Sequence, residues 1–215
     1  MRFGIQGTGM VGKAIATKLV ALGHEVKLGS READNAEAAA WVKSAGRGAS
    51  QGTFADTATF GEMVFVCLRG DVSLSVVKSV AAKLKGKIVV DVSNPLDVSK
   101  GMPFPLLASL VNTNSLGEET QKLLPESSVV KTLNTVNCEV MANPSLVKGE
   151  SDIFISGNDP GAKKKVIEVL RSFGWKNPID LGDITTARGT EMLMPIWMRL
   201  YGLLGTPHFN FRIVK

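Results

Sequence analysis

The sequence predicts an α/β fold, in which helices lie on the faces of a doubly wound, mainly parallel sheet and a small helical lobe follows at the C-terminal end. The first observation is that short apolar runs alternate with segments whose apolar residues recur at helix spacing. The second is that most of these runs are continuously hydrophobic, as strands covered on both faces are. The expected strands are residues 2–6, 25–28, 63–68, 87–92, 128–133 and 152–156.

Helix-period segments separate these strands. Apolar residues at helix spacing in residues 11–22 and 72–84 predict two helices that pack on the sheet. A later helix is expected to begin at Asp159, a capping residue that is followed by proline in the first turn. Its run of lysines, residues 163–165, is interpreted as a solvated face.

The last third of the chain has a different character. Residues 185–204 have the pattern of a helix that Pro195 interrupts or kinks. The residues expected on one side of this helix are Met192, Ile196, Leu200 and Leu204. The tail, residues 206–215, alternates apolar and polar residues as a strand does, so it needs a surface to pair with in its own subunit or in a partner.

Composition narrows the class of function. The 215 residues are 44% hydrophobic and 21% charged, which is typical of a globular protein. A net charge of +5 favours an anionic partner, but the basic residues are scattered, and a phosphorylated small molecule accounts for the charge as well as nucleic acid does. No apolar run has the length of a membrane span and no leader precedes the first strand, so we expect a cytoplasmic protein that binds neither nucleic acid nor membrane. Cys67 and Cys138 lack metal-ligand spacing and are interpreted as free thiols.

A glycine-rich turn follows the first expected strand. Gly7, Gly9 and Gly12 form the pattern GxGxxG and open an amphipathic helix. In a Rossmann-type domain the first glycine permits the tight turn, the second lets the backbone approach a pyrophosphate, and the third lets helix and strand pack closely. Residues 1–140 are therefore interpreted as a dinucleotide-binding domain, and residues 141–215 as a small lobe that contributes to a second-substrate cleft, with a soft boundary.

The end of the second strand indicates which dinucleotide binds. An acidic residue is usual there, because it accepts hydrogen bonds from the ribose hydroxyls, but this chain has Ser30 and Arg31. A hydroxyl beside a guanidinium suits a phosphate dianion, so the pair favours NADP over NAD. The alternative is a solvated Arg31 with Glu32 binding the ribose.

The turns after the later strands contain no acid and base pair. They have the sequences CLRGD, DVSNPLD and KTLNTVN, and neither His24 nor His208 is well placed as a base. The amide and hydroxyl side chains that remain in these turns are Ser93, Asn94, Asn134, Thr135 and Asn137. Hydride transfer between a nicotinamide and a second redox ring needs two rings held face to face without water, and no acid or base. The sequence therefore predicts catalysis by proximity, with no catalytic side chain.

Over essentially its whole length the chain resembles two related groups of proteins. The stretches that carry the resemblance are GTGMVGKAIA, LGHEVKLGSR, KIVVDVSNP, VVKTLNT, ISGNDPGAKKKV, IDLGDITTAR and EMLMPI. The groups are the deazaflavin-dependent NADP oxidoreductases, which pass hydride between NADP(H) and coenzyme F420, and the cytoplasmic reductase domain of the six-transmembrane metalloreductases. The resemblance implies NADP(H) as cofactor and a homodimer.

The resemblance also implies a role for individual segments. Residues 8–11 would line the pyrophosphate, Ser30 and Arg31 would hold the 2′-phosphate, residues 68–74 and 94–96 would border ribose and nicotinamide, and residues 134–138 would form the floor. The cofactor-binding residues are thus expected to be Gly7, Thr8, Gly9, Met10, Val11, Gly12, Ser30, Arg31, Leu68, Arg69, Gly70, Ser93, Asn94, Pro95 and Cys138.

Departures from the family leave the acceptor open. The deazaflavin enzymes have a lysine where this chain has Asn35, and histidine and proline where it has Asn134 and Asn137. KTLNT is closer to the metalloreductase domain, whose acceptor is a flavin, whereas the tail HFNFRIVK is similar to that of the deazaflavin enzymes. Met192, Met194 and Trp197 are expected either to wall a ring pocket or to be plain core.

Two functions remain open. The first is an NADPH-dependent oxidoreductase that transfers hydride between NADP(H) and a deazaflavin, coenzyme F420, or a flavin-type acceptor. The alternative is a non-catalytic NADPH-binding redox sensor. An imine or hydroxy-acid reductase is disfavoured, because its relatives add a long helical domain for which this chain has no room.

Overall fold

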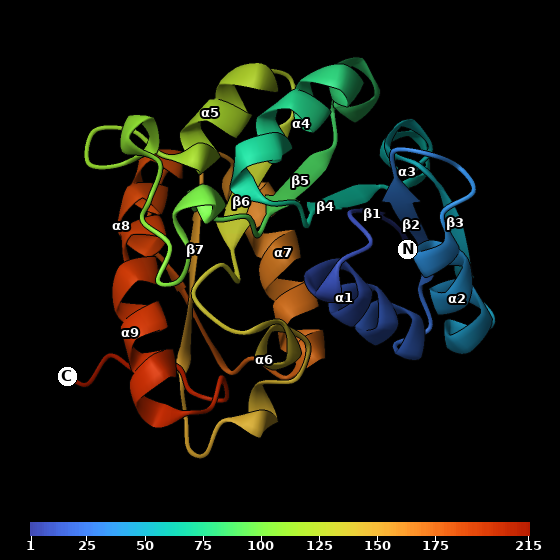
Figure 1. Cartoon of the computed structure of the whole chain (residues 1–215). Helices are drawn as coiled ribbons and strands as arrows, with labels where there is room; N and C mark the ends of the chain where they lie inside the picture. Colours follow the sequence, from blue (N-terminus) through green and yellow to red (C-terminus); the bar gives the residue numbers. More distant parts are fainter.

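The computed structural model describes residues 1–215 and contains one eight-stranded sheet with helices on both faces (Figure 1). The strand order is β3-β2-β1-β4-β5-β6-β7-β8, and every neighbouring pair is parallel except β6 with β7. This is the predicted doubly wound, mainly parallel sheet. The strands are β1 (Arg2–Gln6), β2 (Glu25–Ser30), β3 (Ala49–Thr53), β4 (Met63–Val66), β5 (Ile88–Asp91), β6 (Ser128–Thr132), β7 (Asp152–Gly157) and β8 (Asn177–Asp180).

Two helical layers bury the sheet. The helices are α1 (Met10–Ala21), α2 (Ala36–Ala45), α3 (Phe54–Phe60), α4 (Gly70–Leu84), α5 (Leu116–Leu123), α6 (Cys138–Ala142), α7 (Pro160–Phe173), α8 (Ala187–Met192) and α9 (Met194–Leu204). Buried side chains of α1, α2, α6 and α7 belong to one core cluster. Buried side chains of α3 and α4 belong to a second cluster, together with Leu124, the residue that follows α5. The six predicted strands are confirmed, and β7 and β8 extend the same sheet past residue 140, so the boundary between two domains stays a prediction.

Helix α7 begins as predicted, but its lysines do not share one environment. Asp159 caps the helix by accepting a hydrogen bond from the backbone N–H of Ala162, with Pro160 in the first turn. Lys164 and Lys165 are exposed, whereas Lys163 is buried, so a wholly solvated lysine face is wrong. The Nζ atom of Lys163 lies 2.7 Å from Oδ1 of Asp180 and 2.9 Å from the carbonyl oxygen of Gly182. It lies on the side of α7 that faces β8, which the sequence did not predict.

The helix at the C-terminal end is interrupted near Pro195, as the sequence predicted. Helix α8 ends at Met192 and α9 begins at Met194, with Pro195 in its first turn. The buried residues of α9 are Met194 and Met198, whereas Met192, Ile196 and Leu204, three of the residues predicted to share one side, are exposed. Leu203 is exposed as well. Such a stripe is typical of a surface that another chain covers, and the predicted homodimer stays a prediction.

The tail lies along its own subunit without forming a strand. The backbone N–H of Asp152, at the start of β7, donates to the carbonyl oxygen of Phe211, and the side chain of Asn210 donates to the carbonyl oxygen of Asp152. The ring of Phe209 stacks on Trp197 with centroids 5.2 Å apart. None of the helices has the length and apolar character needed to cross a membrane.

Candidate functional site

The glycine turn joins β1 to α1, and its three glycines meet different surroundings. Gly7 has a φ of +120°, and a Cβ there would lie 2.4 Å from the carbonyl oxygen of Cys67. A Cβ on Gly12 would lie 2.0 Å from the carbonyl oxygen of Gly7. A Cβ on Gly9 would meet no atom within 4 Å. Gly7 and Gly12 thus close the turn against the protein, while Gly9 keeps one side open at the N-terminus of α1, as a bound pyrophosphate requires.

Beside this turn lies a cavity of about 530 Å³, here called the outer cavity. Its lining residues are Gly7, Thr8, Gly9, Ser30, Arg31, Glu32, Asn35, Phe54, Cys67, Leu68, Arg69 and Val72. Arg31 is exposed and forms no ion pair, so its guanidinium is free to bind an anion. The Ser30 hydroxyl donates to the carbonyl oxygen of Glu32 at 2.5 Å and accepts from its N–H at 3.2 Å, which holds the turn that presents Arg31.

Asn35 has a structural role at the rim of the outer cavity. Its Oδ1 accepts a hydrogen bond of 3.0 Å from the N–H of Ala38 and so caps α2. The charge that a lysine would add at this position is absent, and Arg31 and Arg69 are the basic side chains that line the cavity. Arg69 is paired with Asp71 across 2.6 Å.

A second cavity, of about 360 Å³ and here called the inner cavity, shares Gly9, Cys67, Leu68 and Arg69 with the outer one. Its lining residues are Gly9, Met10, Val11, Cys67, Leu68, Arg69, Gly70, Val92, Ser93, Asn94, Leu96, Val98, Asn134, Val136, Asn137, Cys138, Met141, Met194 and Trp197. Most are apolar, and Arg69 is the one charged residue among them. The two cavities together form a long cleft with a polar, basic outer end and a largely apolar inner end.

Two asparagines join the loops at the carboxyl ends of β5 and β6. Asn134 donates through Nδ2 to Oδ1 of Asn94 at 2.9 Å, and Asn94 donates through its own Nδ2 to the carbonyl oxygen of Asn134 at 2.8 Å. Asn134 also donates to the carbonyl oxygen of Thr190 in α8, at 3.1 Å. Asn134 is the residue of the predicted floor, 134–138, that makes these bonds, and the name floor of the inner cavity is kept from here on for the pair of Asn94 and Asn134.

Comparison with known proteins decides the family. The family model described as NADP oxidoreductase, coenzyme F420-dependent, matches residues 2–95. The F420-dependent NADP reductase of Methanocaldococcus jannaschii is 32% identical over 203 residues, which cover 90% of this chain and 89% of that protein. The chain belongs to the family of F420-dependent NADP oxidoreductases. This membership confirms the resemblance and the predicted class of NADP-dependent oxidoreductase.

Further relatives share the fold or part of their length. A crystal structure of a candidate F420-dependent NADP reductase from Arthrobacter sp. FB24 superposes with a TM-score of 0.93 at 44% identity, over 99% of both chains. Metalloreductase STEAP3 of Rattus norvegicus is 32% identical over 91% of this chain, which spans 38% of that protein. An imine reductase from Bacillus cereus, with a TM-score of 0.64 at 18% identity over 95% of this chain and 62% of that one, shares the fold.

Most of the predicted site residues of this family member line the two cavities. Ser30 and Arg31 lie in the outer cavity with Gly7 and Thr8, while the residues after β4, β5 and β6 line the inner one. Gly12, Pro95 and Thr135 line neither. Pro95 lies behind Gly70, where a Cβ on the glycine would be 3.0 Å from the Cα of Pro95. Thr135 is buried, and its hydroxyl has no hydrogen-bond partner. The binding role of each residue stays a prediction.

The structure adds lining residues that the sequence did not indicate. Phe54 lines the outer cavity, and Val98 and Met141 line the inner one. Phe54 follows β3, a strand without an apolar run, so no sequence signal marked it. Met194 and Trp197 line the inner cavity as a ring pocket requires, whereas Met192 does not.

Neither cysteine of the cleft is an activated nucleophile. Burial, reinforced by the charge of Asp91, raises the pKa of the Cys67 thiol well above its usual range. Burial also raises the pKa of the Cys138 thiol, and the neighbouring Glu139 carboxylate adds to the shift. Both thiols are therefore protonated at neutral pH, and they contribute apolar surface to the cleft.

A buried ion network lies directly behind the floor. The Nζ atom of Lys131 lies 2.9 Å from Oδ2 of Asp91 and 2.8 Å from Oε1 of Glu191, and all three side chains are fully buried. Burial opposes the charge on Lys131, but the two carboxylates outweigh it and raise the pKa of the ammonium. Burial raises the pKa of Glu191, and the Lys131 charge counters this shift.

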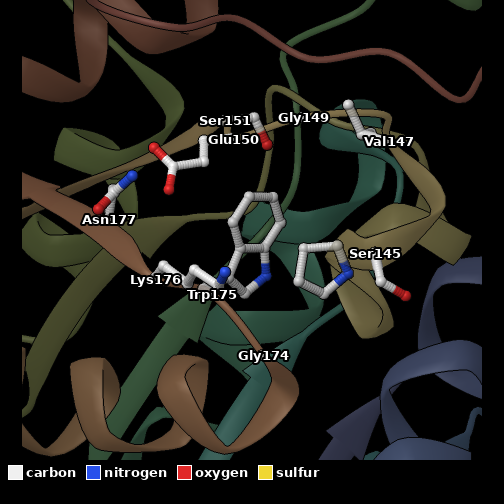
Figure 2. A pocket seen from close by; sticks show the side chains of 10 residues that line it. Ser145, Val147, Gly149, Glu150, Ser151, Gly174, Trp175, Lys176 and Asn177 are labelled. Carbon is white, nitrogen blue, oxygen red and sulfur yellow. The ribbon is translucent and has the colours of Figure 1, made fainter.

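A separate pocket of about 410 Å³ lies where the loop after α6 meets the end of α7 (Figure 2). Its lining residues include Ser145, Glu150, Trp175 and Lys176, which Figure 2 labels. The indole Nε1 of Trp175 donates to the carbonyl oxygen of Met141 at 3.1 Å, so this ring belongs to the core. The pocket shares no residue with the outer or the inner cavity.

Proposed function

We propose that the protein transfers hydride between NADP(H) and the ring of coenzyme F420 or a flavin-type acceptor. The observation that carries this proposal is the cleft itself, in which a basic outer cavity at a glycine turn adjoins a largely apolar inner cavity. The names of the relatives support the NADP and F420 parts of the proposal. The metalloreductase relatives support the flavin alternative more weakly, because this chain spans little more than a third of their length.

The outer cavity would hold the phosphates of NADP(H). The pyrophosphate would lie at the open side of Gly9, where the N-terminus of α1 presents free backbone N–H groups and the positive end of its dipole. The 2′-phosphate would bind the free guanidinium of Arg31 with charge-assisted hydrogen bonds. Glu32, the alternative ribose ligand, lines the same cavity, so binding of both nucleotides must be measured.

The inner cavity would hold the nicotinamide and the acceptor ring. When bound, the reduced nicotinamide supplies a hydride. The apolar walls, among them Leu96, Val136 and Met194, would exclude water. The amides of the floor, which are held by each other and by Thr190, would give the rings a fixed surface to lie on. Since no carboxylate, histidine or lysine lines the inner cavity, these residues act by holding two rings in contact rather than by moving a proton.

Arg31→Ala is expected to weaken NADPH binding by roughly 10- to 150-fold, the equivalent of losing about 1.5–3 kcal/mol from a charge-assisted contact. NADH binding should change little, because NADH carries no 2′-phosphate. Titration of both nucleotides by calorimetry measures the effect. Arg47→Ala is the matched control, since Arg47 is exposed and lines neither cavity. An equal loss for NADPH and NADH would mean that Arg31 does not read the phosphate.

The acceptor is tested by anaerobic mixing of the protein and NADPH with coenzyme F420, free flavins or ferric chelates in turn, while NADPH absorbance is followed. Turnover with F420 alone supports the deazaflavin form of the proposal, and turnover with free flavin supports the flavin form. Tight NADPH binding without turnover by any acceptor would overturn the proposal in favour of a redox sensor.

A further inference from the structure

We propose that the ion network of Lys131, Asp91 and Glu191 positions the floor of the inner cavity. Through Glu191, this positioning depends on how α8 packs against β6 and α5. The proposal rests on the proposed function to the extent that the nicotinamide lies at the floor. None of the three side chains lines either cavity, so each acts through the residues that do.

The network first fixes the loop after β5. The N–H of Ser93 donates to Oδ1 of Asp91 at 2.9 Å, and the carbonyl oxygen of Ser93 accepts from Nζ of Lys131 at 2.6 Å. Both backbone polar groups of Ser93 are therefore bound to charged members of the network. Asn94 is the next residue, so the direction of its side chain depends on how Ser93 is held.

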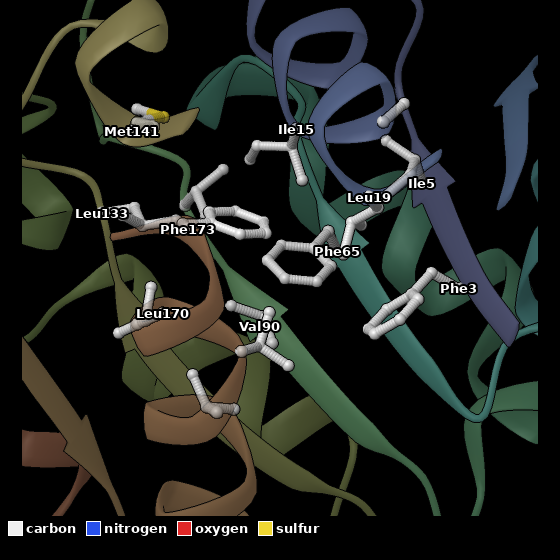
Figure 3. Close-up of a cluster of buried hydrophobic side chains, with 14 of the residues drawn as sticks. Phe3, Ile5, Ile15, Leu19, Phe65, Val90, Leu133, Met141, Leu170 and Phe173 are labelled. Atoms are coloured by element: carbon white, nitrogen blue, oxygen red, sulfur yellow. The ribbon is translucent and has the colours of Figure 1, made fainter. Parts of the chain in front are cut away.

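The network next fixes the loop after β6. Leu133 has a φ of 62°, a left-handed conformation that a leucine keeps only where its surroundings hold it. It is fully buried and belongs to the core cluster that also contains Leu170 and Phe173 (Figure 3). Lys131 anchors the chain before Leu133, and the hydrogen bonds of Asn134 anchor it afterwards. Loss of either anchor would let Leu133 relax and would turn Asn134 away from Asn94.

Glu191 connects this arrangement to the C-terminal helices. Its Oε1 accepts from Lys131 and from the N–H of Gly117 at 3.0 Å, and its Oε2 accepts from the N–H of Leu116 at 2.8 Å. The preceding residue, Thr190, accepts from Asn134 through its carbonyl oxygen. Two successive residues of α8 thus bind β6, the floor and the first turn of α5. The helix that follows, α9, carries Met194 and Trp197 of the cavity wall.

A second ion pair joins the same helices without reaching the floor. Arg188 in α8 binds Glu118 in α5 through two hydrogen bonds, of 2.8 and 2.5 Å. Glu118 also bonds to Ser115, and neither Arg188 nor Glu118 forms a hydrogen bond with Ser93, Asn94 or Asn134. Glu191 both attaches α8 to α5 and, by the proposal, positions the floor, whereas the Arg188 and Glu118 pair does only the first. A variant of this pair therefore serves as the control for attachment alone.

The test compares Glu191→Gln with Arg188→Gln in the full-length protein. Both variants should lower the melting temperature. Only E191Q should make the nicotinamide of bound NADPH more mobile, seen as a shorter fluorescence lifetime and a faster decay of the time-resolved anisotropy. The NADPH dissociation constant should change less than about threefold, because the phosphates bind at the other end of the cleft. E191Q should also lower kcat at least about tenfold with the working acceptor, since small misplacements of reacting rings cost this much or more.

Two outcomes would overturn the proposal. One is nicotinamide fluorescence in E191Q that matches the wild type, and the other is an equal change in E191Q and R188Q for the same loss of melting temperature. If E191Q does not fold, Asp91→Asn takes its place, because its Oδ1 still accepts from Ser93 while the charge on Lys131 loses a partner. If the wild type turns over no acceptor, the proposed function fails, and the fluorescence of bound NADPH still decides the positioning role.

Discussion

Lys131→Met is expected to lower the free energy of unfolding by roughly 3–5 kcal/mol, because it leaves two carboxylates buried without their cation. Asp91 and Glu191 are both about 1% exposed and bind the same Nζ atom. Without that ammonium they repel each other in a medium of low dielectric constant, and at neutral pH one of them must take up a proton or draw water into the core. For a chain of this size the melting temperature should fall by about 6–20 °C.

The control for this change is Lys85→Met, which breaks an ion pair at the surface. Lys85 and Glu126 lie 2.6 Å apart, but their side chains are 65% and 60% exposed. Solvent screens such a pair, and its loss should change the free energy of unfolding by about 1 kcal/mol or less. Urea denaturation of both variants and the wild type measures the difference. Similar losses for K131M and K85M would show that burial does not make the Lys131 network sensitive to loss of one partner.

The sequence predicted the central strands because they are covered on both faces and their side chains are nearly all apolar. It missed β3, with sequence ASQGT, and β8, with sequence NPID. Both are edge strands of the sheet and are only partly buried. Their backbone pairing with β2 and β7 defines them as strands, and a pattern of hydrophobicity along the chain does not record such pairing.

The site divides in the same way. The glycine turn and the pair of Ser30 and Arg31 act through backbone conformation and local charge, so a short stretch of sequence was enough to predict their place in the cleft. Lys131 was visible only as part of the stretch KTLNT. Its partners Asp91 and Glu191 lie far from it along the chain and meet it only after the sheet and α8 have assembled. The sequence likewise grouped Met192, Ile196 and Leu204 on one side without showing that this side is exposed, since periodicity defines a stripe and tertiary packing decides which stripe is buried.

Gly9→Ala is expected to leave the fold intact and to weaken NADPH binding by about 100-fold or more. Gly9 has a φ of −75°, which alanine adopts freely, and its added Cβ meets no protein atom within 4 Å. The free energy of unfolding should therefore stay the same or rise by up to about 1 kcal/mol. The methyl group would instead stand where the pyrophosphate approaches the N–H groups of α1. Loss of two charge-assisted hydrogen bonds, at roughly 1.5–3 kcal/mol each, gives the expected loss of affinity.

Gly12→Ala is the matched variant, and it should fail for the opposite reason. Its Cβ would lie 2.0 Å from the carbonyl oxygen of Gly7, so α1 must move away from the turn before any ligand binds. Overpacking against backbone is expected to cost about 3 kcal/mol or more, well above the effect of G9A. Thermal unfolding without nucleotide, followed by NADPH titration, separates the two positions. If G9A bound NADPH as tightly as the wild type, the pyrophosphate could not lie at the open side of Gly9, because the added methyl group would occupy that space.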